Sequence, residues 1–102
     1  ETKFGFTPEE CRQFFLHENW QNLKNVRIKG LMCMATNTND LQIIRNEFHE
    51  THELFLEIKS TVFSDSEDFN ECSWGMSDDY PIAIEEGSTL IRVGSNIFGA
   101  RI

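Results

Sequence analysis

The stretch from Cys72 to Ile102 decides the fold, and it contains SWGMSDD at residues 73–79 and IRVGSN at residues 91–96. In both motifs a short apolar segment runs directly into a turn built from glycine and serine. Parallel strands of an α/β sheet end in such turns at the edge where ligands bind, and neighbouring strands bring their turns together. Glycine lets a ligand approach the backbone, and serine adds a hydroxyl. The two turns therefore predict a phosphate-binding site at the ends of two neighbouring parallel strands.

A simpler interpretation applies to each turn taken alone. Gly75, Gly94 and Gly99 are residues that ordinary turns use, and one Gly-Ser turn has no specific function. Two such turns at equivalent positions of the topology favour the phosphate site. We therefore expect the pair of turns, and not either turn alone, to bind a ligand.

Arg92 interrupts an otherwise apolar strand pattern. If Ile91 and Val93 face the helices, Arg92 faces the other side of the sheet, which in a barrel is the interior. A buried guanidinium is costly unless it is paired. Two explanations are equally compatible with the chemistry: an internal ion pair with an acidic residue, or a donor to a ring nitrogen or anionic group of a ligand.

The first part of the chain predicts a helix and then a strand. Thr7, Pro8 and Glu10 form a capping box with proline at the first helical position, and Asn25 ends the segment. Its expected apolar side comprises Phe14, Phe15, Leu16, Trp20 and Leu23. Residues 26–34 alternate and then become continuously apolar, which is typical of a strand entering a buried sheet.

The second helix has the clearest pattern. Asn39 or Asp40 can cap it, and residues at helical spacing form one apolar stripe, namely Leu41, Ile44, Phe48, Phe55 and Ile58. A polar connector at 61–67 follows. The remaining expected elements are a strand at 69–74, a turn at 75–77, a short helix at 78–86 with Pro81 in its first turn and Gly87 at its end, and a strand at 89–93. This alternation predicts a parallel sheet of about three strands with crossover helices.

Composition narrows the class of protein. The chain has 102 residues, and 39% of them are hydrophobic, including nine Phe, so it can form a core. A net charge of -8 argues against nucleic-acid binding. Long apolar runs and a basic-then-apolar leader are both missing, so we expect neither membrane insertion nor secretion. Cys11, Cys33 and Cys72 are odd in number and lack C-x-x-C spacing, which favours a reducing compartment, the cytoplasm.

Three other patterns have better structural than chemical explanations. His49 to Glu53 reads HETHE, which has one residue too few between the histidines for the H-E-x-x-H metal motif, so a solvated helix face is expected. Asp78-Asp79 and Glu85-Glu86 lie at helix ends, where capping and solvation explain them. Cys72 precedes the turn on a strand and reads as a buried structural thiol. We therefore expect neither a catalytic residue nor a metal ligand in this chain.

The sequence resembles the pyridoxal phosphate homeostasis proteins, the YggS/PROSC family, which share the alanine-racemase-like barrel. The resemblance rests on the Gly-Met-Ser-Asp-Asp run that begins at Gly75, together with the Arg-Val-Gly-Ser run at 92–95. Residues 83–89 and 96–101 add to it, residues 27–32 resemble the family's sixth-strand segment, and residues 1–6 resemble the loop after its fifth strand. The middle helix matches only in pattern.

The resemblance implies pyridoxal 5'-phosphate (PLP) as the cofactor. By analogy Ser77, Gly94 and Ser95 would hold its phosphate, with Met76 contributing through its backbone or by packing nearby. Arg92 would face the pyridine nitrogen and keep it unprotonated, which weakens the ring as an electron sink. Ser95 stands where the family more often has Thr, and Asn96 stands where small residues are usual.

The resemblance also implies what this chain lacks. The family's Schiff-base lysine lies on the first barrel strand, and Lys3, Lys24, Lys29 and Lys59 match other positions. We therefore expect residues 1–102 to be a single C-terminal fragment of a (β/α)8 (TIM) barrel domain, incomplete as a barrel. Such a fragment would bind phosphate or sulfate weakly and the intact cofactor poorly. Its unpaired strand edges and uncovered inner face predict self-association.

Three kinds of function are consistent with these residues. The resemblance favours a non-catalytic or weakly catalytic carrier of PLP that takes part in PLP homeostasis. An enzyme fragment is the alternative, from either an amino-acid racemase-like PLP enzyme or a phosphosugar-converting barrel. A short chain that is natural at this length would instead favour an interaction module.

Overall fold

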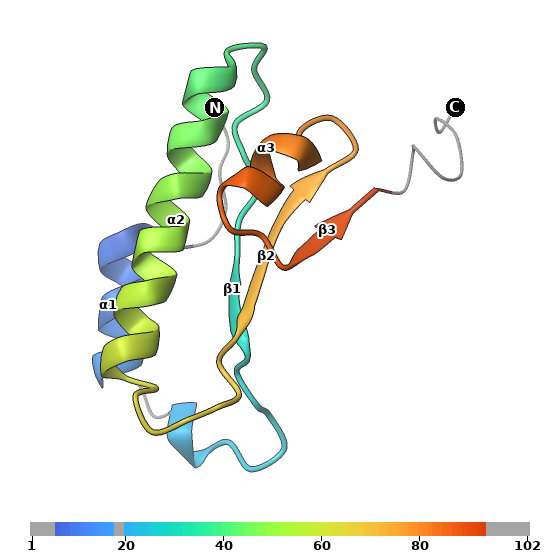
Figure 1. Cartoon of the computed structure of the whole chain (residues 1–102). Helices are drawn as coiled ribbons and strands as arrows, with labels where there is room; N and C mark the ends of the chain where they lie inside the picture. Colours follow the sequence, from blue (N-terminus) through green and yellow to red (C-terminus); the bar gives the residue numbers. More distant parts are fainter. Residues whose placement is uncertain (1–5, 18–19, 94–102) are drawn as a thin grey trace.

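Three parallel strands and the helices between them form the structure (Figure 1). The computed structural model describes residues 6–17 and 20–93. Its elements are the helix α1 (Pro8–His17), a 3-10 turn η1 (Trp20–Asn22), β1 (Gly30–Met32), α2 (Leu41–Thr61), β2 (Glu71–Met76), α3 (Tyr80–Glu85) and β3 (Leu90–Arg92). The sheet order is β1-β2-β3, and both neighbouring pairs are parallel. The predicted α/β alternation with a three-stranded parallel sheet is confirmed.

α1 begins with the predicted capping box. The Thr7 amide donates to Glu10 Oε1 at 2.9 Å, and the Glu10 amide donates to Thr7 Oγ1 at 3.1 Å. The expected continuation to Asn25 is wrong, because the helix ends at His17. Leu16 was expected on the apolar side but is 64% exposed, since it follows buried Phe15 and consecutive residues of a helix point about 100° apart.

β1 is shorter than predicted. Only Gly30–Met32 form the strand, and Val26 and Met34 at the ends of the expected segment are exposed. In the described sheet β1 pairs with β2 from Gly30 opposite Glu71 to Met32 opposite Ser73, although β2 itself continues to Met76. The two backbones meet so closely at Gly30 that a Cβ there would lie 1.8 Å from the Glu71 carbonyl oxygen. Glycine is therefore required for this pairing.

α2 supplies most of the core. Asp40 caps it by accepting from the Gln42 amide at 3.0 Å, as predicted. The predicted stripe is buried except for Leu41, which is 61% exposed in the first turn, and it gains Leu54. The expected polar connector after α2 contains one core residue, Phe63, whose ring stacks on Phe69 with centroids 4.2 Å apart. Together these residues cover one face of the sheet, where Cys72 and Trp74 are buried.

The opposite face of the sheet carries none of the described helices (Figure 1). Met32 and Leu90, which pair with Ser73 from either side, are 66% and 53% exposed. β1 and β3 are the outer strands of the described sheet. Helices thus cover one face, while the other presents apolar side chains to solvent.

The boundaries near the predicted site also differ from expectation. The strand β2 continues to Met76, so Gly75 and Met76 belong to it and the turn begins at Ser77. The register between β2 and β3 shifts between Ser73 and Met76, which identifies a bulge around Gly75. The short helix α3 has Pro81 in its first turn, as predicted. Gly87 ends it with φ +94°, also as predicted.

Candidate functional site

The carboxyl ends of β2 and β3 lie side by side, and this edge is the candidate site (Figure 1). Met76, the last residue of β2, pairs with Arg92, the last residue of β3. Ser77 follows Met76 directly in the turn that leads to α3. The structure therefore brings three of the predicted site residues together. Gly94 and Ser95, the other two, lie outside the described residues.

A reciprocal pair of hydrogen bonds closes the turn after β2. The Met76 amide donates to Asp79 Oδ1 at 2.8 Å, and the Asp79 amide donates to the Met76 carbonyl at 3.2 Å. Asp79 occupies the N-cap position of α3, but its side chain makes no capping bond to that helix. Its carboxylate points back onto the turn that contains Ser77. Sequence reasoning assigned Asp79 to capping or solvation and missed this role, which depends on the backbone of the turn.

The backbone conformation and the packing at position 75 explain why this residue is glycine. Its φ of +109° lies in the left-handed region that favours glycine, and a Cβ there would lie 2.6 Å from the Cβ of Ala83 and 3.0 Å from Ile91 Cγ2. Ala83 is fully buried in α3. Glycine is therefore needed to dock α3 on the sheet. The close approach of a ligand is not required to explain it.

Arg92 has an incompletely satisfied side chain. Its Nη2 donates to the Cys33 carbonyl at 3.4 Å, a long bond, and its Nε is buried without a partner among the described residues. No ion pair of Arg92 with a described carboxylate accompanies these contacts. Of the two explanations left open by the sequence, the internal ion pair gains no support from the described part of the chain. A buried donor without an acceptor at a sheet edge fits the ligand explanation.

The loop after β1 is fixed beside this edge. The Thr36 amide donates to Glu47 Oε1 at 2.7 Å, and the Thr36 hydroxyl donates to Glu47 Oε2 at 2.6 Å. Glu47 lies on α2, so its carboxylate ties the loop to the helix. The Arg92 contact with the Cys33 carbonyl ties the start of the same loop to β3. Nothing in the sequence pattern singled out Glu47.

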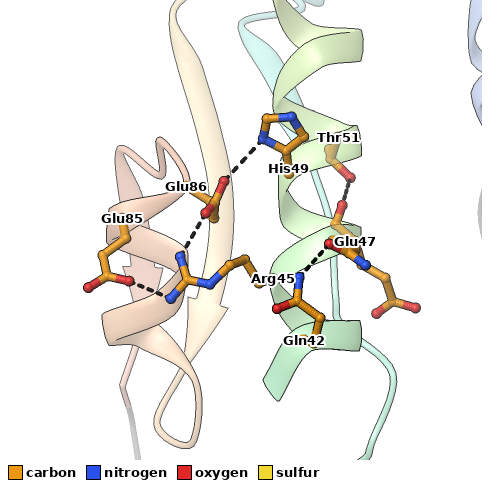
Figure 2. Close-up of polar contacts among 8 residues, drawn as sticks. Gln42, Arg45, Glu47, His49, Thr51, Glu85 and Glu86 are labelled. Carbon is orange, nitrogen blue, oxygen red and sulfur yellow. Dashed lines mark hydrogen bonds and ion pairs between the residues drawn. The ribbon is translucent and has the colours of Figure 1, made fainter. Parts of the chain in front are cut away.

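The HETHE segment takes part in a network that joins α2 to α3 (Figure 2). Arg45 donates to Glu85 at 2.6 Å and to Glu86 at 2.8 Å, and His49 Nδ1 lies 3.2 Å from Glu86 Oε1. The hydrogen bond from Arg45 lowers the pKa of Glu86, and His49 adds to this effect. The predicted solvated face is thus correct for exposure, since the His49 side chain is 59% exposed, but incomplete for contacts.

His52, the other histidine of that segment, lies in packing contacts. Its ring centroid is 6.0 Å from that of Trp74 and 6.3 Å from that of Phe55. A Cβ at Gly87 would lie within 2.8 Å of the His52 ring. In the described part of the chain, no group of three His, Cys, Asp or Glu residues could hold a metal ion.

Cys72 is the buried thiol that the sequence predicted. It is 2% exposed and lies in the core beneath α2. Burial, with a smaller contribution from the Glu71 carboxylate, raises its pKa to about 11. A thiol with so little thiolate at neutral pH is a poor nucleophile.

No described helix is both long enough and apolar enough to span a bilayer.

Comparison with curated proteins gives consistent similarity over almost the whole chain. A pyridoxal phosphate homeostasis protein of Haemophilus influenzae is 37% identical over 101 residues, which is 99% of this chain and 41% of that protein. Proteins of the same name from Helicobacter pylori and Schizosaccharomyces pombe are 36% and 33% identical, over 96% and 99% of this chain and 40% of each relative. This chain is a homologue of the pyridoxal phosphate homeostasis proteins. It spans about two fifths of the length of these homologues, and no family model matches it.

Solved structures of PipY, a member of the COG0325 family, agree with the fold. PipY of Synechococcus elongatus with PLP bound is similar with a TM-score of 0.81 and 29% identity, over 97% of this chain and 45% of PipY. PipY without PLP gives a TM-score of 0.83 and 31% identity, over 96% and 44% of the two chains. The arrangement of helices and strands described above is therefore that of a little under half of PipY.

Proposed function

We propose that this chain supplies the phosphate-binding part of a PLP site in a protein of PLP homeostasis. In this proposal residues 1–102 form the C-terminal part of a (β/α)8 barrel of the alanine-racemase-like kind, whose remaining strands lie outside the chain. The observation that carries the proposal is the buried Arg92 Nε, which has no acceptor among the described residues and lies at the sheet edge beside the Ser77 turn. PLP is bound in a structure of the similar protein PipY, which supports PLP as the ligand of the proposed site.

In the proposed site, residues of two turns bind the phosphate of the cofactor and a residue of β3 contacts its ring. Ser77, Gly94 and Ser95 hold the phosphate, and Arg92 faces the pyridine nitrogen. Met76 contributes by packing, because its amide already donates to Asp79 and its side chain is 41% exposed at this edge. When bound, PLP supplies an electron sink, which an arginine opposite the ring nitrogen weakens. The residues of this chain thus favour holding the cofactor over driving chemistry on it.

The lysines of the described part lie away from the candidate edge. The Lys59 ammonium donates to the Phe69 carbonyl at 2.8 Å and contacts Asn70, and it lies over the Phe55 ring. Lys24 and Lys29 precede β1 and are exposed. None of these three amines lies at the candidate edge. We propose a non-catalytic or weakly catalytic carrier rather than an amino-acid racemase or a phosphosugar-converting enzyme, and the names of the similar curated proteins support this choice.

Binding measurements with three ligands test this proposal. The chain is titrated with PLP, with pyridoxal, which lacks the phosphate, and with inorganic phosphate, and amide shifts are followed by NMR. We expect PLP to bind with a dissociation constant in the millimolar range, about −4 kcal/mol, because the site is incomplete. Pyridoxal should bind at least tenfold more weakly, and phosphate should shift the Ser77 amide.

Matched variants assign the contacts. Arg92→Gln should weaken PLP binding severalfold and leave inorganic phosphate binding unchanged, whereas Ser77→Ala should weaken both. Arg27→Gln and Ser64→Ala are the controls, since both side chains lie on exposed parts of the chain. Equal affinity for PLP and pyridoxal, or no effect of Ser77→Ala on phosphate, would contradict the proposed site.

The open sheet face and the two outer strands support a further part of the proposal, which is self-association of this chain. Met32 and Leu90 expose apolar surface on the face that carries no described helix. In a complete barrel the other strands would cover that face. In the chain alone we propose that a second copy does so.

The three cysteines of this chain form no disulfide, which supports a reducing compartment, and we propose the cytoplasm.

A further inference from the structure

The turn after β2 contains a negatively charged side chain of the protein itself, that of Asp79. Its carboxylate accepts a hydrogen bond of 2.8 Å from the Met76 amide, at the edge where the proposed phosphate would bind. The returning bond from the Asp79 amide to the Met76 carbonyl is 3.2 Å. The side chain therefore closes a ring around Ser77 and occupies a backbone donor within that ring.

We propose that Asp79 is a positioning residue that orders the Ser77 turn for phosphate and at the same time limits phosphate affinity through its charge. This inference rests on the proposed phosphate site. It separates two properties of one side chain. The acceptor oxygen fixes the backbone of the turn, and the negative charge opposes a second anion beside it.

The contacts of Asp79 support the positioning part. Its side chain makes no capping bond to α3, although it stands at the N-cap position where an aspartate would normally do so. Its described side-chain hydrogen bond is the one to the Met76 amide. Gly75, the residue before Met76, has φ +109° and lies at a bulge, so the chain direction changes just before the Met76 amide. The turn thus lies between a bulge and a short helix, and the Asp79 side chain is hydrogen-bonded to the Met76 amide at its start.

Electrostatics support the limiting part. A carboxylate and a bound phosphate within one turn repel each other, and at the dielectric constant of water the energy for charges several ångströms apart corresponds to roughly three- to tenfold in affinity. An asparagine in place of Asp79 keeps an oxygen acceptor for the Met76 amide and removes the charge. The two properties can therefore be separated by single substitutions.

The experiment compares Asp79→Asn, Asp79→Ala and the matched control Asp78→Asn in the 102-residue chain. Asp78 is the adjacent carboxylate, so its substitution makes the same change in net charge one residue away. Amide hydrogen exchange at Met76 reports the turn without any ligand. Inorganic phosphate titrations followed at the Ser77 amide report affinity. Circular dichroism and the dispersion of the NMR spectrum show whether each variant is folded.

We expect protection of the Met76 amide in the original chain and in Asp79→Asn, and its loss in Asp79→Ala. Phosphate should bind Asp79→Asn about three- to tenfold more tightly than the original chain, by the same electrostatic reasoning. Asp78→Asn should change the affinity by less than half as much. Asp79→Ala should bind phosphate more weakly than Asp79→Asn.

Two kinds of result would overturn the inference, and they differ. If phosphate shifts the Ser77 amide but Asp79→Asn and Asp78→Asn bind it alike, the proposed site stands and the role of Asp79 is refuted. If no variant shows a shift at Ser77 with phosphate, the proposed site fails and the inference fails with it. An unfolded Asp79→Ala chain would leave the comparison of the two asparagine variants to decide.

Discussion

At the scale of single residues, Arg92 places a buried donor, its Nε, at the candidate edge without a described acceptor. Its position in an apolar strand pattern predicted an unusual role. Asp79 shows the opposite case. Its role depends on a bulge and a turn whose backbone no local pattern specifies, so sequence reasoning could not find it. Gly94 and Ser95 were predicted beside Ser77 and lie outside the described residues, so their part in the site stays a prediction.

The three cysteines give a prediction at this scale. Cys11 and Cys72 are buried, and burial raises the pKa of both thiols, in Cys72 from 9.0 to about 11. Two units of pKa mean about a hundredfold less thiolate at Cys72. With Ellman's reagent at pH 8 and no denaturant, we expect fast release of one equivalent, from half-buried Cys33, and slow release of two more.

A Cys33→Ser variant provides the control for this measurement. It should show no fast phase, while unfolding in urea should make all remaining thiols of each chain react at one rate. A fast phase that persists in Cys33→Ser would show that Cys11 or Cys72 is accessible, contrary to the packing described above.

At the scale of elements, α2 and α3 are joined by charged contacts whose strength depends on pH. Hydrogen bonding to Arg45 lowers the pKa of Glu86 below the ordinary 4.5, and Arg12 does the same for Glu57 between α1 and α2. The unfolded chain therefore binds protons to these groups at higher pH than the folded chain does. Their contribution to stability is present above pH 4.5 and disappears as the pH falls through the lower folded-state values.

Urea unfolding at several pH values tests this coupling. The urea midpoint should fall between pH 6 and pH 3, and Glu86→Gln should lower it at pH 6 and reduce its further fall. Glu50→Gln is the matched control, since Glu50 is an exposed glutamate of the same helix α2. The Glu57 side chain is 45% exposed and that of Glu86 is 16% exposed, and ion pairs that solvent reaches contribute little, so each effect should be small. A variant with the full pH dependence of the original chain would exclude a role for Glu86.

Elements were predictable where periodicity and capping agree, and less so where a strand depends on its neighbours. Thr7 with Glu10, and Asp40 with the stripe from Ile44 to Ile58, specify two helix starts and one buried face from local sequence. The predicted ends of β1 and β2 were wrong by two to four residues. Strand ends are set by where a partner offers backbone groups, and that information lies elsewhere in the chain.

At the scale of the whole molecule, the uncovered sheet face is the feature with the clearest physical consequence. Light scattering after size exclusion, at micromolar concentration, should show a species larger than the 11.9 kDa of one chain. Leu90→Lys should shift the distribution toward monomer, because it places a charge on the open face. Leu56→Lys, an equally drastic change at an exposed position of α2, should not. A single monomeric peak for the original chain would contradict self-association.

The order of the parallel strands also has a consequence for how the chain folds. Pairing of β2 with β3 joins Ser73 to Leu90 across the short helix α3, whereas pairing of β1 with β2 joins Leu31 to Cys72 across the whole of α2. Closing the longer connection costs more chain entropy before any contact is gained. We therefore expect the β2-α3-β3 unit, with its bulge at Gly75, to form early, and β1 to dock last. The edge proposed to bind phosphate would then be among the first parts of the molecule to acquire its native shape.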